Sequence, residues 1–344
     1  MNQAAIKALT DFNNSPAAHG HPMSHSGRKS ADAIEKARYK IAELIGAQNS
    51  NQIFFTTTCS QACEWAVFIL SLISEREIYA ATAIEHPAIR QSIDSYFIKE
   101  DIVQLNINND GQVILDREIY PALVCIYAQN EIGTIQKVND LNCQYLLSDT
   151  SQALGKIPFS VGNIDIAVFG AHKFGGPASV GFLYLKDTNW WSEFDAGSRY
   201  FMDRAGTPDT ASIVATAAAL EYAIQTLPER TQKMLEFRGE LEPGLKSLGC
   251  EIVGENVERL PNTTFIVLPK EKSMHVLLEL SEHGVYCGLG SACGSIHTGA
   301  SPLMRKMSKG DSATDFMRIS NFGEYSKSEA AMFLDVLKKV LGAK

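Results

Sequence analysis

The stretch LSDTSQALGKIPFSVGNIDIAVFGAHKFGGPASVGFLY, which runs from Leu147 to Tyr184, decides the fold. It opens in an apolar strand that ends at Asp149. A second apolar strand, over 164–169, leads directly into a glycine-containing turn that carries Lys173. Open α/β sheets bind ligands in the crevice outside the carboxyl ends of their strands. We therefore expect Asp149 and Lys173 to face one such crevice.

Further short apolar strands flank this stretch and alternate with helical or polar connections. The run 122–127 is apolar at every position, which is typical of strands covered by helices on both faces. The pattern predicts an α/β fold with a large domain built on a mostly parallel seven-stranded sheet. Strands are expected at 52–56, 77–81, 102–105, 122–127, 145–148, 164–169 and 181–184, with helices at 30–46 and 59–72.

The pattern of apolar and polar residues changes after Thr210. Two helices are expected at 211–227 and 231–248, followed by strands at 250–253, 264–268 and 285–287 and helices at 273–283 and 326–341. This pattern indicates a smaller C-terminal α+β domain. We predict a large domain over 13–225 and a small domain over 226–344, with the N-terminal helix 1–12 joined to the small domain.

Composition narrows the class of protein. The chain has 344 residues, 45% of them hydrophobic and 20% charged, which is ordinary for a globular protein. A formal net charge of −8 disfavours direct binding to nucleic acid. No apolar run approaches the roughly 20 residues that span a bilayer, and the N-terminus lacks the layout of a signal peptide. Seven cysteines without framework spacing fit reduced thiols, so the cytoplasm is expected.

The pairing of a lysine with a carboxylate has a chemical interpretation. A lysine amine forms a Schiff base with pyridoxal 5'-phosphate, and an aspartate holds the pyridinium nitrogen of that cofactor protonated. The competing interpretation is a solvated loop lysine and an unrelated aspartate at the end of a strand. The spacing of Lys173 and Asp149 alone leaves both interpretations open.

The same region resembles the cysteine desulfurase branch of the class V aminotransferase family, enzymes with the pyridoxal-phosphate fold type I. That branch carries D-A-x-Q-x-x-G-K-x-P and then S-x-H-K-x-x-G-P, where this chain has DTSQALGKIP and GAHKFGGP. The resemblance implies that Lys173 is the Schiff-base residue and that Asp149 contacts the ring nitrogen. It also implies Gln152 near the ring hydroxyl and His172 near the phosphate. Gly170 departs from the pattern, because the branch often has a phosphate-binding serine there.

Three further segments resemble motifs of this branch in the same order. The segment IEHPAI resembles E-H-x-A-[IV], which implies that His86 stacks on the cofactor ring and takes part in catalysis. The segment QNEIG resembles N-N-E-[IV]-G, which implies that Asn130 lies by the ring hydroxyl and the substrate. The segment TTTCSQ resembles T-S-G-A-T-E, a turn that cradles the phosphate at a helix N-terminus and here would use Cys59 and Ser60.

The segment RAGTP resembles R-x-G-T-x, in which the threonine, here Thr207, reaches the phosphate of a neighbouring subunit. The resemblance therefore implies a homodimer with shared sites. A loop with His19, His21 and His25 offers a metal interpretation, but it has no nearby carboxylates or thiols. We expect no metal there.

Two motifs lie in the C-terminal part. The segment GLGSACGS resembles G-S-A-C, the mobile loop whose cysteine accepts sulfur, which implies this role for Cys293. Glycines and serines around the thiol fit the access that thiolate chemistry needs. The segment MRIS resembles R-[IFV]-S, which implies that Arg318 pairs with the substrate carboxylate.

The combined expectation is a cysteine desulfurase, which converts L-cysteine to L-alanine and forms a persulfide for delivery to an acceptor protein. Enzymes of this kind serve iron–sulfur cluster assembly, tRNA thiolation and DNA phosphorothioation, and the sequence does not choose among these pathways. One alternative is a selenocysteine lyase or another enzyme of the class V family. A second is a non-catalytic scaffold of a sulfur-transfer complex, suggested by Thr58, Cys59 and Gly170 and by an opening without the strand that usually precedes the first helix of the family.

Overall fold

The computed structural model describes residues 1–15, 24–74, 79–115, 120–190, 208–269, 273–289, 303 and 315–342. Its helices are α1 (Gln3–Asn13), α2 (His25–Ile45), α3 (Cys59–Ile73), α4 (Pro87–Tyr96), α6 (Thr210–Gln225), α7 (Leu227–Ser247), α8 (Ser273–Glu282) and α10 (Lys327–Val340). Its strands are β1 (Ile53–Thr56), β2 (Tyr79–Thr82), β3 (Ile102–Leu105), β4 (Tyr120–Val124), β5 (Cys143–Asp149), β6 (Ile166–Gly170), β7 (Gly181–Leu185), β8 (Glu251–Ile252), β9 (Thr263–Val267) and β10 (Phe316–Ser320).

The larger sheet confirms the predicted fold class. Its seven strands lie in the order β1-β7-β6-β5-β4-β2-β3. Strands β3, β2, β4, β5 and β6 pair in parallel, whereas β7 runs antiparallel to both of its neighbours, β6 and β1. The carboxyl ends of β2, β4, β5 and β6 therefore meet at one edge of the sheet.

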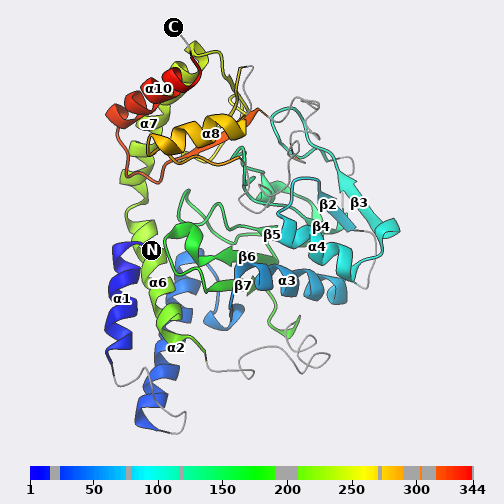
Figure 1. The fold of residues 1–344 in the computed structure, drawn as a ribbon. Coiled ribbons are helices and arrows are strands. Elements are labelled where there is room, and N and C mark those ends of the chain that lie inside the picture. Colours follow the sequence, from blue (N-terminus) through cyan, green and yellow to red (C-terminus); the bar gives the residue numbers. More distant parts are fainter. Residues whose placement is uncertain are drawn as a thin grey trace.

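Helices cover both faces of this sheet (Figure 1). Successive residues of its strands divide between two core clusters, as with Ala80 and Ala81 in β2 or Ala167 and Val168 in β6. The first cluster includes α1, α2 and α6, and the second includes α3 and α4. This alternation follows from the two-residue period of a strand, and it explains why the strands are apolar at every position.

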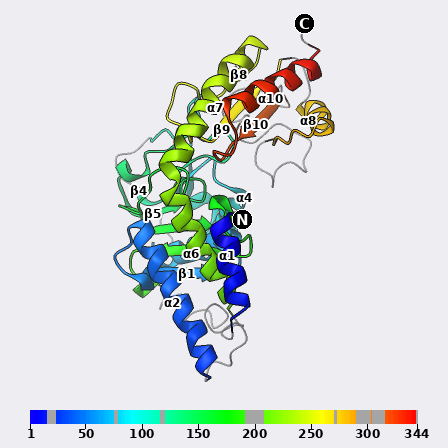
Figure 2. The same ribbon diagram turned by 90° about the vertical axis from the view of Figure 1, so that its left-hand side faces the viewer.

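The N-terminal helix belongs by its contacts to the larger sheet. Helix α1 packs against α6, and Ala5 lies in the core cluster of that side (Figure 2). The side chain of Asn2 caps α1 by accepting from the Ala5 N–H at 2.9 Å, and its own backbone N–H donates to the Gly175 carbonyl at 2.8 Å. These contacts favour grouping 1–12 with the large domain rather than the small one, and the boundary near residue 225 stays a prediction.

A second, antiparallel sheet with the order β10-β9-β8 lies with α7, α8 and α10 at the other end of the molecule (Figure 1). The predicted strand at 285–287 is wrong, because the chain there makes only an isolated bridge from Gly288 to Arg318. Strand β10 pairs with β9 over Phe316–Ser320 instead. The alternating burial of Val285 and Cys287 resembles a strand locally, but among the described residues of this stretch only Gly288 reaches β10, where it exchanges two backbone hydrogen bonds with Arg318.

No helix within the described ranges combines the length and the apolar character that a bilayer crossing requires.

The start of α3 packs directly on β7, so a glycine is required there. A Cβ at Gly181 would lie 2.5 Å from the Thr58 carbonyl oxygen and 2.6 Å from the Cys59 nitrogen. Gly181→Ala is therefore expected to lower the free energy of unfolding by about 1–3 kcal/mol, as overpacking does. Urea unfolding measures this change.

Gly239, in the exposed middle of α7, is the matched control, since a Cβ there would meet nothing within 4 Å. Gly239→Ala should stabilise the protein by about 0.5–1 kcal/mol through helix propensity. Equal effects of the two substitutions would contradict the close packing at Gly181.

Candidate functional site

Asp149 and Lys173 lie at the ends of neighbouring parallel strands. Asp149 is the last residue of β5, and Lys173 lies in a short 3₁₀ helix, Ala171–Phe174, that follows β6 directly. Both groups act electrostatically on His86: its pKa is lowered by burial, raised by Asp149 and lowered by Lys173. The structure thus brings together three of the residues selected from the sequence.

Asp149 is held as a buried acceptor. Its side chain belongs to a residue only 4% exposed, and Oδ1 accepts from the Ser151 N–H at 3.0 Å. Its backbone carbonyl accepts from the Tyr127 N–H at 2.9 Å. A buried carboxylate is stabilised by such donors and by nearby cations, so this carboxylate suits a protonated partner.

His86 caps helix α4. Its Nδ1 accepts from the Ala88 N–H at 3.1 Å, so in the neutral ring the proton is assigned to Nε2. Burial, together with the neighbouring Lys173 and Arg90, lowers the pKa of His86 below its ordinary value, and Asp149 only partly opposes this effect. The imidazole is therefore neutral near pH 7 and presents a donor at Nε2.

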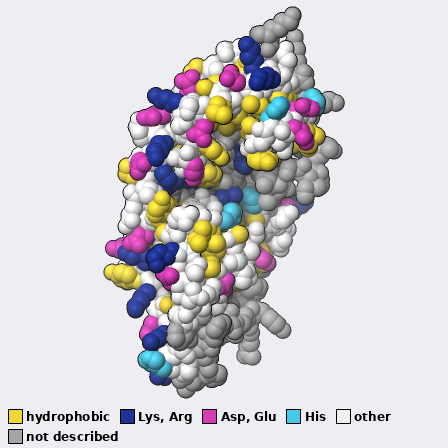
Figure 3. Space-filling view, turned by 60° about the vertical axis from the view of Figure 1, so that its left-hand side comes forward, with side chains coloured by type: hydrophobic (Ala, Val, Ile, Leu, Met, Phe, Trp, Pro, Cys, Tyr) yellow, Lys and Arg dark blue, Asp and Glu magenta, His cyan; other side chains and the backbone are white. Residues whose placement is uncertain are grey.

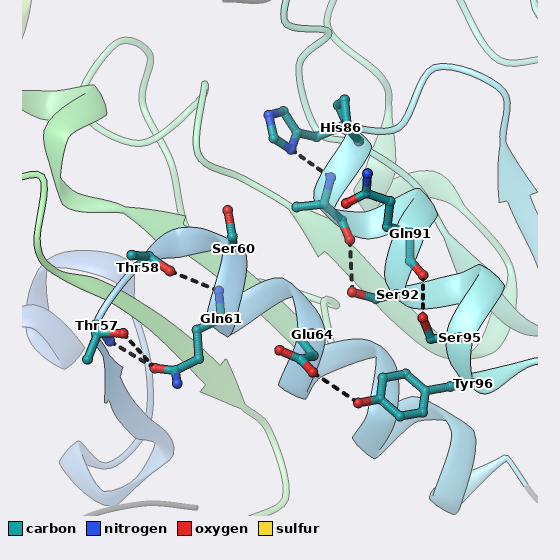
Figure 4. Close-up of a pocket in the computed structure, with 12 residues that line it drawn as sticks. Thr57, Thr58, Ser60, Gln61, Glu64, His86, Gln91, Ser92, Ser95 and Tyr96 are labelled. Atoms are coloured by element: carbon teal, nitrogen blue, oxygen red, sulfur yellow. Dashed lines mark hydrogen bonds between the residues drawn. The ribbon is translucent and has the colours of Figure 1, made fainter. Parts of the chain in front are cut away.

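A pocket of about 650 Å³ opens between the N-terminal half of α3 and one face of α4 along its length (Figure 4). His86 and Ser60 line it from its two sides, and a hydrogen bond of 3.2 Å from Tyr96 to Glu64 joins the two helices further along. Neither Lys173 nor Asp149 is among its lining residues. The pocket therefore meets this group of residues through His86. In the space-filling view, histidine and basic side chains gather near the middle of one face (Figure 3).

The start of α3 presents the predicted phosphate turn. Thr58 is the N-cap, and its Oγ1 accepts from the Gln61 N–H at 3.1 Å. Cys59 is the first helical residue, and its Sγ lies 3.2 Å from the Ser151 Oγ. The bulky residues at 58 and 59 thus leave the helix start intact, and their side chains turn to local partners.

Gly170 and Cys59 share one space. A Cβ at Gly170 would lie 3.2 Å from the Cβ of Cys59 and 3.2 Å from Cε1 of His172. The missing side chain at 170 and the larger side chain at 59 therefore compensate for each other. This contact also places His172 beside the α3 turn, where its pKa is lowered by burial and then by Lys173 and Lys156.

Gln152 follows Asp149 by three residues, and its side chain is hydrogen-bonded to Lys156, a residue that the sequence did not single out. Lys156 donates from Nζ to Oε1 of Gln152, and its amine lies 5.5 Å from the centre of the Phe322 ring. Lys156 is 2% exposed. Burial lowers its pKa well below the ordinary value, Lys173 and Arg318 lower it further, and Asp149 opposes them. The Gly-Lys-x-Pro sequence that follows Gln152 was the sequence signal that could have identified Lys156.

Arg318 enters the site from β10 of the smaller sheet. Its Nη1 donates to the backbone carbonyl of Asn130 at 3.0 Å, and its Nε is buried without a partner among the described residues. Burial lowers its pKa, and Glu131 raises it. The contact with Asn130, which was not predicted, uses the main chain of Asn130, and the guanidinium of Arg318 keeps a donor for a further acceptor such as the expected substrate carboxylate.

Two predicted site residues, Thr207 and Cys293, lie outside the described residues. The same holds for His19 and His21 of the histidine loop, whereas His25 begins α2. Within the part of the chain that the structure covers, no group of three His, Cys, Asp or Glu side chains is arranged to hold a metal ion.

Comparison with known proteins identifies the family of this chain. A family model described as aminotransferase class-V matches residues 1–332. The chain belongs to the aminotransferase class-V family. It is 28% identical over 340 residues to cysteine desulfurase IscS of Clostridium botulinum (strain Kyoto / Type A2), covering 91% of this chain and 84% of that protein. It is 30% identical over 310 residues to cysteine desulfurase NifS of Azotobacter vinelandii, covering 84% of this chain and 77% of that protein.

Solved structures share the fold. A NifS-like protein superposes with a TM-score of 0.82 at 24% identity, covering 99% of this chain and 96% of its own. DndA from Streptomyces lividans superposes with a TM-score of 0.72 at 20% identity, covering 93% and 96%. The resemblance to the family stated from sequence motifs is confirmed.

The shared space of Gly170 and Cys59 yields a coupling prediction. Gly170→Ser should destabilise the protein by about 1–3 kcal/mol, because the added atoms meet Cys59 and His172. In the background of Cys59→Gly, which removes the Cβ that the new side chain meets, the cost of the same substitution should fall by about 0.5–3 kcal/mol, as for residues in contact. Urea unfolding of the four proteins measures the coupling. The control substitution, Gly239→Ser, should show none with Cys59→Gly.

The buried Lys156 predicts a pH-dependent stability. Its pKa is lowered in the folded chain, so between that lowered value and 10.5 only the unfolded chain binds this proton. The stability of the wild type should therefore rise with pH in this window, by up to about 1.4 kcal/mol per pH unit. Lys156→Met removes the effect.

The advantage of Lys156→Met over the wild type should be largest at the acid end and shrink as the pH approaches 10.5. Unfolding by urea at a series of pH values measures it. Lys246→Met, at the surface, should keep the pH dependence of the wild type. A constant difference between Lys156→Met and the wild type would show that the amine is not buried uncharged.

Proposed function

We propose that this chain is a cysteine desulfurase that converts L-cysteine to L-alanine and passes the sulfur, as a persulfide of Cys293, to an acceptor protein. The observation that carries the proposal is the convergence of Asp149 and Lys173 on His86 at the carboxyl ends of β5 and β6. Membership of the aminotransferase class-V family and the names of its relatives, NifS and IscS, support it.

The described residues fit pyridoxal 5'-phosphate. Burial and then Lys173 and Arg318 lower the pKa of Lys156, while Asp149 raises it. Burial also lowers the pKa of Arg318, but Glu131 raises it, so the site keeps Lys173 and Arg318 as basic groups for phosphate and carboxylate anions. Lys173 would hold the cofactor, Asp149 its ring nitrogen, and the start of α3 with Ser60 its phosphate. The bound cofactor supplies an electron sink for a carbanion at the substrate α-carbon.

The hydrogen-bond donors and acceptors of Arg318, Lys173 and His86 indicate their roles in the reaction. The Nε of Arg318, which has no partner among the described residues, would donate to the carboxylate of L-cysteine. The amine of Lys173 would move the α-proton, because the Nδ1 of His86 is already used by the Ala88 N–H. His86 would act as a neutral ring that can deliver the proton on Nε2.

The sulfur step needs a thiolate outside the buried cysteines. Burial raises the pKa of Cys143 to about 12, of Cys250 to about 11 and of Cys287 to about 12, and it raises the pKa of Cys125 as well. The thiolate of Cys293 would attack the sulfur of the substrate. A sulfur–sulfur bond forms, the carbon–sulfur bond breaks with its electron pair left on carbon, and a proton then completes alanine.

We extend the proposal to the compartment, the oligomeric state and the partners of this chain. The six described cysteines are free thiols, which favours a reducing compartment such as the cytoplasm. The pocket beside Ser60 and His86 gives room for a residue of a second subunit, so we propose a homodimer in which Thr207 completes the partner's phosphate site. L-cysteine and an acceptor protein are the other partners.

The decisive measurement is an absorbance scan of the purified protein with pyridoxal 5'-phosphate, before and after L-cysteine, followed by assays of alanine and sulfide. We expect a cofactor band that shifts with L-cysteine. Lys173→Ala should lower alanine production by about 10²–10⁴-fold, the usual contribution of a positioned proton-transfer group. Lys246→Ala, at the surface, should retain activity. A protein that stays colourless with added cofactor would favour the scaffold instead.

The variant Cys293→Ala distinguishes a cysteine desulfurase from the alternative enzymes of the class V family. With L-cysteine, this variant should lose sulfur transfer while its cofactor band remains. Cys287→Ala is the matched control, because burial keeps that thiol protonated. Unchanged turnover in Cys293→Ala would favour a selenocysteine lyase or another class V enzyme.

A further inference from the structure

Glu85 is a buried carboxyl group next to His86 that the proposed reaction does not use. The residue is 3% exposed and lies in the connection between β2 and α4. Its Oε1 accepts from the Thr82 hydroxyl and from the backbone N–H of Ile126, the latter at 2.7 Å. Glu85 therefore ties the segment that carries His86 to the chain that leaves β4.

The same chain segment also holds Asp149. The N–H of Tyr127, the residue after Ile126, donates to the backbone carbonyl of Asp149 at 2.9 Å. Consecutive N–H groups of one short segment thus bind Glu85 on one side and the end of β5 on the other. The spacing between His86 and Asp149 is set through this two-residue link.

The surroundings of Glu85 favour the neutral acid. Its Oε2 is buried and has no hydrogen-bond partner among the described residues. Burial raises the pKa of Glu85 to about 8, and Asp149 raises it while Thr82, Ile126 and Arg90 lower it. The other titratable neighbours are the buried thiols Cys63 and Cys125, whose pKa values Glu85 in turn raises.

We infer that Glu85 is a positioning residue of this site, a neutral carboxylic acid that fixes His86 relative to Asp149. This rests on the proposed function for its catalytic meaning. Loss of the proton from Glu85 places a second negative charge near Asp149 in a region of low dielectric, where like charges repel strongly. The link through Ile126 and Tyr127 then joins two residues whose carboxylates repel each other.

The test compares Glu85→Gln, which keeps an acceptor oxygen and has no charge, with Glu85→Ala, which removes the tether. Glu229→Gln, an exposed carboxylate on α7, is the control. In the apoprotein, the folding equilibrium constant of Glu85→Gln relative to the wild type should grow by about tenfold per pH unit between pH 5 and 8, since only the folded wild type holds this proton. Glu229→Gln should show no such growth.

A second measurement reports the position of the His86 ring. In the apoprotein, the His86 ring resonances in NMR spectra should stay in place in Glu85→Gln and shift in Glu85→Ala. In the holoenzyme, the wild-type kcat for alanine formation should fall above pH 8, and this fall should be absent in Glu85→Gln.

Each outcome decides a separate claim. A pH-independent stability difference between Glu85→Gln and the wild type would overturn the neutral acid, and unmoved His86 resonances in Glu85→Ala would overturn the positioning role. An unchanged alkaline fall of kcat in Glu85→Gln would overturn its part in the reaction. Wild-type holoenzyme without desulfurase activity would overturn the proposed function, while the apoprotein measurements still decide the role of Glu85.

Discussion

The structure depends on one buried carboxylate at the end of a parallel strand. Asp149 is almost fully enclosed, and a charge in that position needs donors and cations around it. It receives the Ser151 N–H and lies in the field of the amines of Lys173 and Lys156. The buried Lys156 is held uncharged, whereas Lys173 is half-buried and Arg318 keeps a donor that has no partner among the described residues, so the cluster still offers groups for anionic ligands.

Close approach of backbones makes this cluster possible. Gly181 lets the start of α3 rest on β7, and Gly155, with a φ of +74°, lets the turn after β5 pack against Phe174, the neighbour of Lys173. A side chain at either position would separate the elements that carry the charged groups. The glycines therefore act on the site through the distances between secondary structures, although neither has a side chain that could touch a ligand.

Sequence reasoning recovered those parts of the site that have a local signal. We predicted the apolar strands, the aspartate at the end of β5 and the lysine after β6. Strand ends and turns can be recognised from the types of consecutive residues. Sequence reasoning missed β10, the buried amine of Lys156 and the tether of Glu85. Strand β10 was overlooked because its alternation of apolar and polar residues is short. The roles of Lys156 and Glu85 depend on burial and on their partners Gln152 and Ile126, which cannot be recognised from the residue types.

By itself, the sequence determined the α/β fold class and the family, because periodicity and the order of motifs can be recognised without knowledge of contacts, and it predicted that Asp149 and Lys173 face one crevice. Only the tertiary structure decided that Lys156 is enclosed, that Arg318 reaches Asn130 from a different sheet, and that Glu85 and Asp149 share one backbone link. Burial and hydrogen bonding between residues far apart in the chain exist only once the chain has folded, and these are what set the charge of each group.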